Sequence, residues 1–165
     1  MRGRSLEERL QRVEDILEIQ DVMNRYATYI NKGWAGKEVQ PDMIPTVFAE
    51  DATFDAPEMG HSGRGAAMIG EGMAKETQVV EFSMHIFLNP VLQVDGDTAS
   101  GNWLMWIAVK RELGTRFVFM SYDLTFSRTP DGWRIQTLLL NIGAMIPQPD
   151  AWLASQMPLP PPASS

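Results

Sequence analysis

The sequence predicts an α+β domain in which a long N-terminal helix covers a curved, strongly twisted antiparallel sheet that encloses one apolar pocket. Two observations carry this prediction: residues 6–30 have a helical apolar period, and from residue 82 onward long β-rich segments alternate with turn residues. Helices first and hairpins afterwards is an α+β order, and it excludes the alternating βαβ order of nucleotide-binding sheets. A chain of 165 residues suffices for one domain with its own core.

The N-terminal helix is predicted from its cap and its apolar spacing. Ser5 followed by Glu8 has the spacing of a capping box. Apolar residues recur at intervals of three and four in two groups, Leu6, Leu10, Val13 and Leu17, then Ile19, Met23, Tyr26 and Ile30. Gly33 is expected to stop the helix.

Two further helices and a strand are expected before the main sheet, which gives about three N-terminal helices in all. A segment bounded by Gly and Pro leads to a short helix around residues 43–48, with Asp42 as a candidate cap. A strand follows at 53–56, and residues 63–77 are expected to form a third helix. Its internal glycines cost about 1 kcal/mol each relative to Ala, so a bent or loose helix is expected.

Four long strands are predicted over residues 82–94, 98–111, 116–128 and 133–146. Asp95-Gly96-Asp97 and Pro130-Asp131-Gly132 separate two of the pairs, and Asp-Gly turns between β-rich runs are typical of hairpins. The domain is therefore expected to span residues 1–150. Residues 151–165 form a Pro-rich tail that is expected to remain outside the core.

Composition limits the partners. A net charge of −7 opposes binding to nucleic acid or to an anionic membrane, and the chain has no apolar run of membrane-spanning length and no signal-peptide pattern. A cytoplasmic protein is expected. With 11 Met, 5 Trp and 7 Phe, the apolar residues suit a shaped cavity, although each one alone is better explained as core. Together with the acidic charge, they favour a neutral or aromatic ligand over a phosphorylated one.

Two strands are apolar on both alternating faces, within residues 102–109 and 135–146. An antiparallel sheet usually has one face in water, so another subunit is expected to cover the second apolar face. This predicts a homodimer or homotrimer.

Common catalytic motifs are missing. The stretch Gly63-Arg64-Gly65 lacks the third glycine of a dinucleotide-binding loop, and the chain has no nucleophile elbow, Walker loop or zinc-protease motif. Two histidines and no cysteine cannot form the usual metal sites. Neither a cofactor nor a metal is therefore expected.

His85 is the leading catalytic candidate. It lies in the middle of an otherwise apolar segment, residues 82–88, and an imidazole can both accept and return a proton. The alternative is a core histidine bonded to a backbone carbonyl, which is the more common situation for a polar residue on a strand.

A second group of candidates stands at the end of the long helix: Tyr26, Tyr29 and Asn31. A tyrosine hydroxyl there could donate to a ligand oxygen. Positions 26 and 31 differ by about 140° on a straight helix, so both reach one pocket only if the helix unwinds at Asn31. The alternative is that Tyr26 is a core aromatic and Asn31 a C-terminal cap.

Polar residues on the later strands are further candidates. Asn141 is alone in an apolar run and could hold a ligand or only a neighbouring strand, and Asp123 could orient a histidine or lie on the wet face. His61, in the Gly-rich segment 60–65, is expected to be exposed. The expected apolar contacts of a substrate are Phe54, Met59 and Trp103.

Five segments together resemble the SnoaL-like branch of the nuclear-transport-factor-2-like (NTF2-like) superfamily: residues 19–27, 48–54, 63–65, 94–99 and 131–135. The resemblance spans residues 5–146. It implies a cone-shaped α+β barrel with one pocket, usually in a dimer or trimer. The superfamily includes dehydratases, cyclases, isomerases, epoxide hydrolases, a lyase that releases formaldehyde and members that only bind, so the fold does not determine the reaction.

The dehydratases of this branch, such as scytalone dehydratase and bile-acid dehydratase, are the nearer match. They pair a tyrosine on the first helix with an acid five residues later and with a histidine on a strand, and Tyr26, Asn31 and His85 occupy these places. Asn31 departs from the pattern because it cannot ionise. The resemblance implies a cofactor-independent lyase that removes water or a small aldehyde from a small hydrophobic, aromatic or polycyclic hydroxylated compound. A binding protein, or an isomerase or cyclase, is the alternative.

Overall fold

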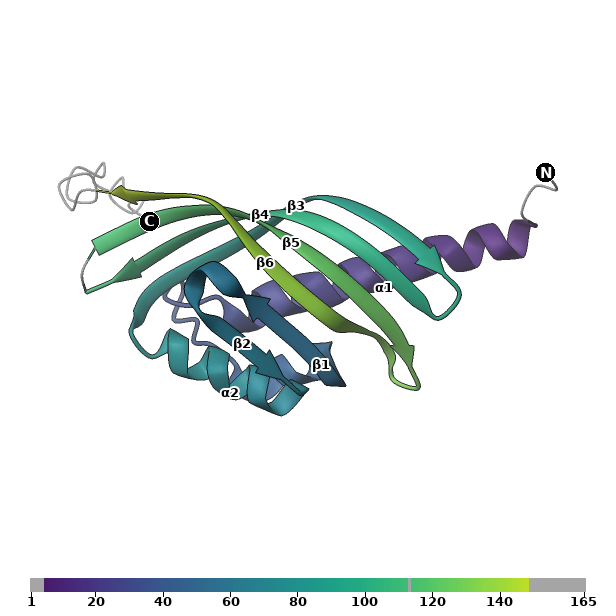
Figure 1. Ribbon diagram of the computed structural model, residues 1–165, viewed down its shortest axis with the longest axis horizontal. Coiled ribbons are helices and arrows are strands. Elements are labelled where there is room, and N and C mark those ends of the chain that lie inside the picture. Colours follow the sequence, from purple (N-terminus) through teal and green to yellow (C-terminus); the bar gives the residue numbers. More distant parts are fainter. Residues whose placement is uncertain (1–4, 113, 149–165) are drawn as a thin grey trace, which may run out of the picture.

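The computed structural model describes residues 5–112 and 114–148, which form helices and one curved sheet (Figure 1). The helices are α1 (Leu6–Ile30), the 3-10 helices η1 (Pro41–Val47) and η2 (Pro57–Met59), and α2 (Ala66–Thr77). The strands are β1 (Phe48–Ala56), β2 (His61–Arg64), β3 (Val80–Asp95), β4 (Thr98–Arg111), β5 (Gly114–Thr129) and β6 (Gly132–Gln148). The predicted α+β class is confirmed. The predicted tail, 151–165, lies outside the described residues.

The strand order is β2-β1-β6-β5-β4-β3, and within the described residues the sheet stays open, with β2 and β3 at its edges. Strands β3 to β6 form consecutive antiparallel hairpins, as the turn residues predicted. Strand β1 runs parallel to β6, so the sheet is mixed, whereas an antiparallel sheet was expected. Turn residues fix the direction of strands joined by hairpins, but β1 and β6 are far apart in the chain and no turn relates them.

The first strands differ from the prediction. Strand β1 begins at Phe48 rather than at residue 53, and the Gly-rich segment 60–65, for which no strand was predicted, contains β2, which pairs with β1. Strand β2 consists of His, Ser, Gly and Arg, so it lacks the apolar alternation by which a strand is predicted from a sequence. It is held in the sheet by backbone pairing with β1. Helix α2 begins at Ala66, three residues after the expected start.

The end of α1 is built by close contact with β3. The helix stops at Ile30, and Asn31 is extended with φ −78° and ψ 145°. Lys32 then pairs with Ser83 of β3. Gly33 has φ +90°, and a Cβ atom there would lie 2.3 Å from the carbonyl oxygen of Glu81. Only glycine therefore allows the chain to pass β3 at this point.

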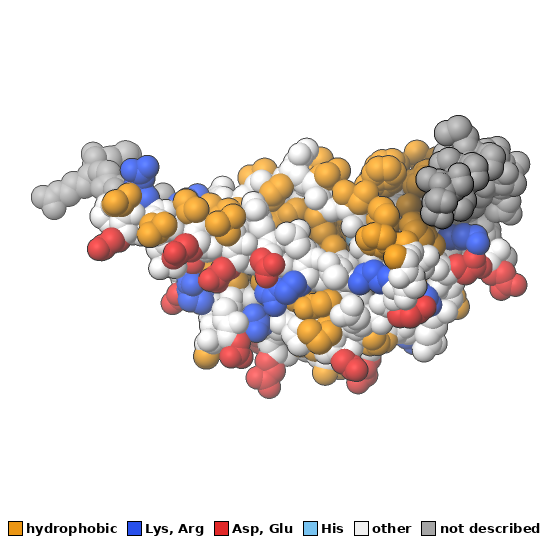
Figure 2. Space-filling model, turned by 180° about the vertical axis from the view of Figure 1, so that it is seen from behind, with side chains coloured by type: hydrophobic (Ala, Val, Ile, Leu, Met, Phe, Trp, Pro, Cys, Tyr) orange, Lys and Arg blue, Asp and Glu red, His pale blue; other side chains and the backbone are white. Residues whose placement is uncertain are grey.

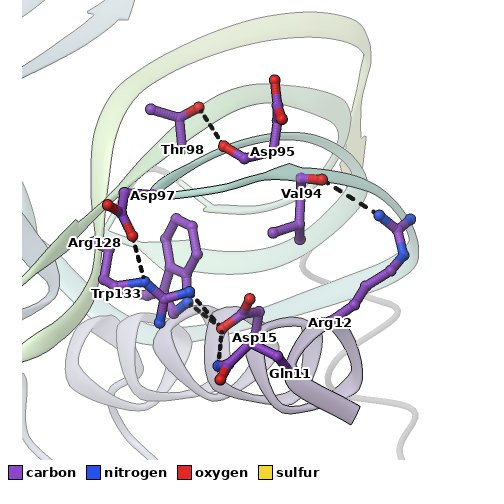
Figure 3. A network of polar contacts seen from close by, with 9 residues as sticks. All are labelled: Gln11, Arg12, Asp15, Val94, Asp95, Asp97, Thr98, Arg128 and Trp133. Atoms are coloured by element: carbon purple, nitrogen blue, oxygen red, sulfur yellow. Dashed lines mark hydrogen bonds and ion pairs between the residues drawn. The ribbon is translucent and has the colours of Figure 1, made fainter. Parts of the chain in front are cut away.

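A polar network fixes the N-terminal half of α1 to the far ends of the strands (Figure 3). Asp15 is 3% exposed, and its Oδ1 accepts hydrogen bonds from Arg128 Nη2 at 2.7 Å, Gln11 Nε2 at 3.1 Å and Trp133 Nε1 at 3.2 Å. Arg128 also donates to Asp97 at 3.0 Å, and its guanidinium lies 4.5 Å from the Trp133 ring. One carboxylate thus joins the helix to β5 and β6.

The two apolar groups predicted on α1 have different surroundings. Ile19, Met23, Tyr26 and Ile30 are buried against the sheet, as an amphipathic helix requires. The stripe formed by Leu6, Leu10, Val13 and Leu17 is more than half exposed at every position. The start of α1 projects past the sheet (Figure 1), and a row of apolar side chains follows the helix in the view from behind (Figure 2). The amphipathic pattern therefore continues on a face of α1 that residues 5–112 and 114–148 leave uncovered.

The sheet has an inner face packed toward α1 and an outer face that is also largely apolar. On β4, Trp103 and Met105 are buried on the inner face, whereas Leu104 of the outer face is 49% exposed. Apolar side chains of the outer face gather toward the end of the molecule where β6 finishes (Figure 2). On β4 the structure thus confirms the prediction that both faces carry apolar side chains.

Candidate functional site

A cavity of about 670 Å³ lies between α1, α2 and the inner face of the sheet. This volume is typical of pockets that hold small organic molecules. Its lining runs from buried residues, among them Tyr26 and Ser83, to exposed ones such as Met68 and Arg111. The walls between are mainly aliphatic and include Ile107, Val109, Val118 and Leu140. A bound molecule would thus meet an apolar channel with a deep closed end.

His85 lies at the deep end and is held by Asn31. The Asn31 Oδ1 atom accepts the backbone N–H of His85 at 2.7 Å and lies 2.9 Å from His85 Nδ1. Because a backbone N–H can only donate, the atom facing it must be the amide oxygen, and this oxygen can only accept from the ring. The bond therefore places the imidazole proton on Nδ1. The other nitrogen, Nε2, keeps its lone pair.

Asn31 reaches this position because α1 ends one residue earlier. The predicted unwinding at Asn31 is confirmed: its extended backbone turns the side chain toward β3, while Tyr26 still belongs to the last helical turns. Both residues consequently reach one cavity from the same helix end. Asn31 acts on the cavity through His85 and does not itself line it.

Burial keeps the ring of His85 neutral. It lowers the pKa of His85 to about 3, since a charged imidazolium loses its hydration in the apolar surroundings. Asn31 offers a dipole in place of the negative charge that an acid would supply. The ring is therefore a neutral proton acceptor across the physiological pH range.

Two tyrosines face the same end of the cavity. Tyr26 is 1% exposed and its hydroxyl lies 3.6 Å from Met73 Sδ. Burial, and after it the charge and hydrogen bond of Tyr122, raise the pKa of Tyr26, and burial likewise raises the pKa of Tyr122. Both phenols therefore keep their protons and can donate hydrogen bonds. Tyr26 also stacks on Phe87 at 5.9 Å, so it is both a core aromatic and part of the cavity wall.

The exposed end of the cavity carries charge. His61, predicted to be exposed, is partly exposed and lines this end, with Nε2 3.4 Å from Glu76 Oε1. Arg111 Nη2 lies 3.7 Å from Glu76 Oε2. Phe54 and Met59, the predicted apolar contacts, also line the cavity.

Other predicted site residues lie elsewhere. Trp103 packs against Phe126 in the core, at a ring distance of 5.7 Å, and Tyr29 packs on the edge of the core; neither lines the cavity. Asn141 and Asp123 lie on the outer face, where Asn141 Nδ2 donates to Asp123 Oδ2 at 2.9 Å. Asn141 thus holds a neighbouring strand, and Asp123 is separated from His85 by the sheet.

Sequence reasoning missed Tyr122 and Ser83. Ser83 is 2% exposed, lines the cavity and donates to the carbonyl of Ile30 at 3.1 Å. Strand alternation could have found both residues. Ser83 is two positions from His85, and Tyr122 shares a face with Val118.

Over residues 5–112 and 114–148, no helix combines the length and apolarity needed to span a membrane. In the same ranges, no three His, Cys, Asp or Glu side chains are grouped as a metal site would need.

Residues 11–138 match the family model of the SnoaL-like domain. An uncharacterised protein of Mycobacterium tuberculosis is 29% identical over 128 residues, which cover 74% of this chain and 82% of the relative.

Three solved structures share the fold. A candidate scytalone dehydratase from Novosphingobium aromaticivorans has a TM-score of 0.72 and 13% identity, over 84% of this chain and 90% of its own. A hexachlorocyclohexane dehydrochlorinase from Novosphingobium barchaimii has a TM-score of 0.75 and 16% identity, over 92% and 99%. An NTF2-like superfamily protein from Salmonella enterica has a TM-score of 0.66 and 20% identity, over 78% and 90%. The predicted NTF2-like fold is confirmed.

Proposed function

The chain belongs to the SnoaL-like domain family, and we propose that it is a cofactor-independent lyase in which His85 moves the proton. Its substrate would be a small hydrophobic hydroxylated compound, aromatic or polycyclic, that loses water or a small aldehyde. The observation that carries the proposal is the bond between Asn31 Oδ1 and His85 Nδ1, which leaves Nε2 as a proton acceptor at the closed end of an apolar cavity. The dehydratase and dehydrochlorinase among the similar structures agree with an elimination.

Loss of water would proceed in two linked steps. His85 Nε2 accepts a proton from the carbon next to the one that bears the hydroxyl, and the C–H electron pair becomes the second bond of a C=C group. The C–O bond breaks with its electron pair, and the leaving oxygen takes the proton back from the imidazolium and departs as water. His85 returns to its neutral form, so the cycle needs no further reactant.

Tyr26 has the properties needed to assist the departing oxygen. Its raised pKa keeps the hydroxyl protonated, so it can donate a hydrogen bond to developing negative charge without competing for the substrate proton. The aliphatic walls offer water no hydrogen-bond partner beside the reacting carbon, and such apolar surroundings strengthen each of these interactions.

A binding protein is the second candidate, and one observation favours it. A pKa of about 3 makes His85 a weak base, and Asn31 supplies no negative charge to stabilise the imidazolium. In that case His85 would only accept a hydrogen bond from a ligand hydroxyl. The substrate of the lyase would have to carry an acidified C–H bond for the weaker base to suffice.

The test begins with the ligand that the protein retains. Native mass spectrometry of the purified protein identifies any bound compound, and that compound and hydroxylated analogues are then incubated with the protein. Mass spectrometry should show loss of water or of an aldehyde. For His85→Ala, turnover should fall by roughly 100-fold or more while binding persists, because general acid–base help is lost.

The matched control is Gln93→Ala, an exposed side chain on the same strand and outside the cavity. It should keep the activity of the parent protein, and circular dichroism should show that both variants fold. If folded His85→Ala turned over at the parent rate, the histidine would be structural. If no compound were turned over while ligands bound equally well to both variants, the binding protein would be the better description.

A further inference from the structure

The outer end of the cavity carries positive charge on an otherwise acidic protein. Lys75, Arg111 and Arg116 line the cavity there, and Glu76 is the one carboxylate in its described lining. The whole chain, by contrast, has a net charge of −7. A local excess of cations at the rim of a low-dielectric cavity attracts anions whatever the total charge of the protein.

Arg116 is the rim guanidinium that has no carboxylate partner among the described residues, and a guanidinium can bind both oxygens of a carboxylate, which the ammonium of Lys75 cannot do in a fixed fork. Glu76 already lies near Arg111, whereas among the described residues the contact recorded for the Arg116 guanidinium is Met145 Sδ, at 3.6 Å. A thioether accepts hydrogen bonds weakly, so the five N–H donors of Arg116 remain available for a stronger acceptor. Both Arg116 and Met145 line the cavity.

The strand register measures how far Arg116 is from His85. Ile107 of β4 pairs with His85 on one side and with Val118 on the other, and Val109 pairs with Ser83 and Arg116. Arg116 is therefore two strands across and two residues along from His85. With about 4.8 Å between strands and about 3.3 Å per residue, the two Cα atoms are roughly 12 Å apart. The aliphatic residues between them form an apolar wall.

We infer that the cavity selects an elongated hydrophobic carboxylic acid, with its carboxylate bound by Arg116 and its reacting carbon at His85, on the order of 10 Å away. The identity of the reacting end rests on the function proposed above, whereas the acid site rests on the rim charges alone. The guanidinium fork matches the two oxygens of a carboxylate. The neutral or aromatic ligand predicted from composition and charge is thus narrowed to one that is apolar for most of its length and carries a carboxylate at one end.

The experiment compares two ligands of the same shape. Naphthylbutanoic acid and naphthylbutanamide differ in the charge of the terminal group, and calorimetry measures both dissociation constants. The parent protein should bind the acid about five- to tenfold more tightly, as expected for a charge-assisted hydrogen bond at a partly open site. Added salt should reduce this preference.

Arg116→Gln should remove most of the preference and leave binding of the amide unchanged. Arg9→Gln, on the exposed part of α1, makes the same charge change outside the cavity and should keep the preference. Naphthylphosphonate tests the class of anion, because tighter binding of this dianion than of the carboxylate would show a phosphate-type site and overturn the inference.

Equal affinity for acid and amide, absence of acid binding up to millimolar concentration, or a preference that survives Arg116→Gln would each overturn the inference. None of these readouts depends on turnover. An acid preference that requires Arg116 would support the inference even if no elimination were found. Elimination from neutral substrates without an acid preference would support the proposed function alone.

Discussion

In the cavity wall, His85 is held by the side-chain amide of Asn31. A carboxylate at the position of Asn31 would form a charged pair with the histidine instead. Asn31 Oδ1 reproduces two geometric tasks of an acid, because it binds the His85 backbone N–H and fixes the proton on Nδ1. It does not reproduce the charge. For the base proposed above, orientation and strength are thus separated, and a single substitution can test them independently.

Asn31→Asp should raise the pKa of His85. A negative charge 2.9 Å from Nδ1 favours the imidazolium and opposes the effect of burial, which holds the pKa at about 3 in the parent protein. The base works when neutral. The parent protein should therefore lose no activity through His85 between pH 8 and about pH 5, whereas the acidic limb of the variant should move up by about one to three pH units.

The measurement is kcat/KM against pH, together with an NMR titration of the imidazole that needs no substrate. His85→Ala identifies which of the two histidine signals belongs to His85. Asn24→Asp, on an exposed face of α1, makes the same chemical change away from the cavity and should leave both curves unchanged. An unchanged titration of His85 in Asn31→Asp would show that the pair is not coupled in solution.

Tyr26→Phe tests the second polar group at the closed end. The substitution keeps the ring that stacks on Phe87 and removes the hydroxyl. We expect kcat to fall about tenfold and KM to change little, because the lost hydrogen bond strengthens only as charge develops. Tyr29→Phe, outside the cavity, is the matched control. An equal loss in both variants would point to packing rather than to the Tyr26 hydroxyl.

At the scale of elements, local signals predicted what local contacts build. The capping box of α1 is present, with Glu8 N–H to Ser5 Oγ at 3.1 Å and Ser5 N–H to Glu8 Oε2 at 2.7 Å. Strand β4 has the predicted bounds, since the turns on both sides define it. The parallel pairing of β1 and the existence of β2 depend on contacts between distant segments, and no short-range pattern encodes them.

In the candidate site, too, the sequence predicted the residues that local patterns single out. His85 was found because a polar residue interrupts an apolar strand, and Asn31 because a helix stop follows it. Tyr122 was missed although its strand alternates, with Val118 and Tyr122 on the buried face and Asp123 on the other, because a tyrosine in an apolar row is usually interpreted as core. For Asn141 the sequence left a ligand or a neighbouring strand open, and the structure shows a hydrogen bond to the neighbouring strand on the outer face. Inner and outer faces of a doubly apolar strand look alike in sequence.

Asp15→Asn should destabilise the attachment of α1. Burial acts to raise the pKa of Asp15, but hydrogen bonds from Arg128, Gln11 and Trp133 and the charge of Arg128 outweigh it, so the pKa is lowered. The variant removes the charge opposite Arg128 and should cost about 2 to 3 kcal/mol of the free energy of unfolding near neutral pH. Urea denaturation measures it.

The sign of the pH dependence follows from the lowered pKa. The carboxylate contributes its stability above the unfolded pKa of about 4 and loses it as pH falls through the folded value. The difference between parent and Asp15→Asn should therefore shrink below about pH 4. Asp21→Asn, which breaks an exposed pair with Arg25, should cost less than about 0.5 kcal/mol. Equal costs for the two variants would contradict the role assigned to the network.

At the scale of the whole molecule, the outer face of the sheet carries exposed apolar side chains together with a group of polar side chains that hydrogen-bond to one another. Trp106 stacks on Phe119 at 6.0 Å and contacts Phe117 edge-on at 5.6 Å. Four residues further along the same two strands, both carboxylate oxygens of Asp123 accept hydrogen bonds, from Asn102 at 2.6 Å and from Asn141 at 2.9 Å. A carboxylate that is already paired costs less to cover, so the face is suited to contact with a second subunit.

We predict that this face is the interface of a homodimer or homotrimer. Exposed apolar residues there include Leu88, Leu104, Phe119 and Leu139. Because single exposed apolar residues are common but contiguous ones mark interfaces, the parent protein should sediment as an oligomer at micromolar concentration.

Leu104→Glu should shift it to the monomer, since an unpaired charge in the interface centre costs several kcal/mol. Val79→Glu changes an exposed residue beyond the end of α2 and should leave the oligomer intact. Leu10→Glu tests the second exposed apolar surface, the stripe on α1. If this variant also dissociates, the interface extends from the outer face of the sheet to the start of α1. A monomeric parent protein would refute the prediction.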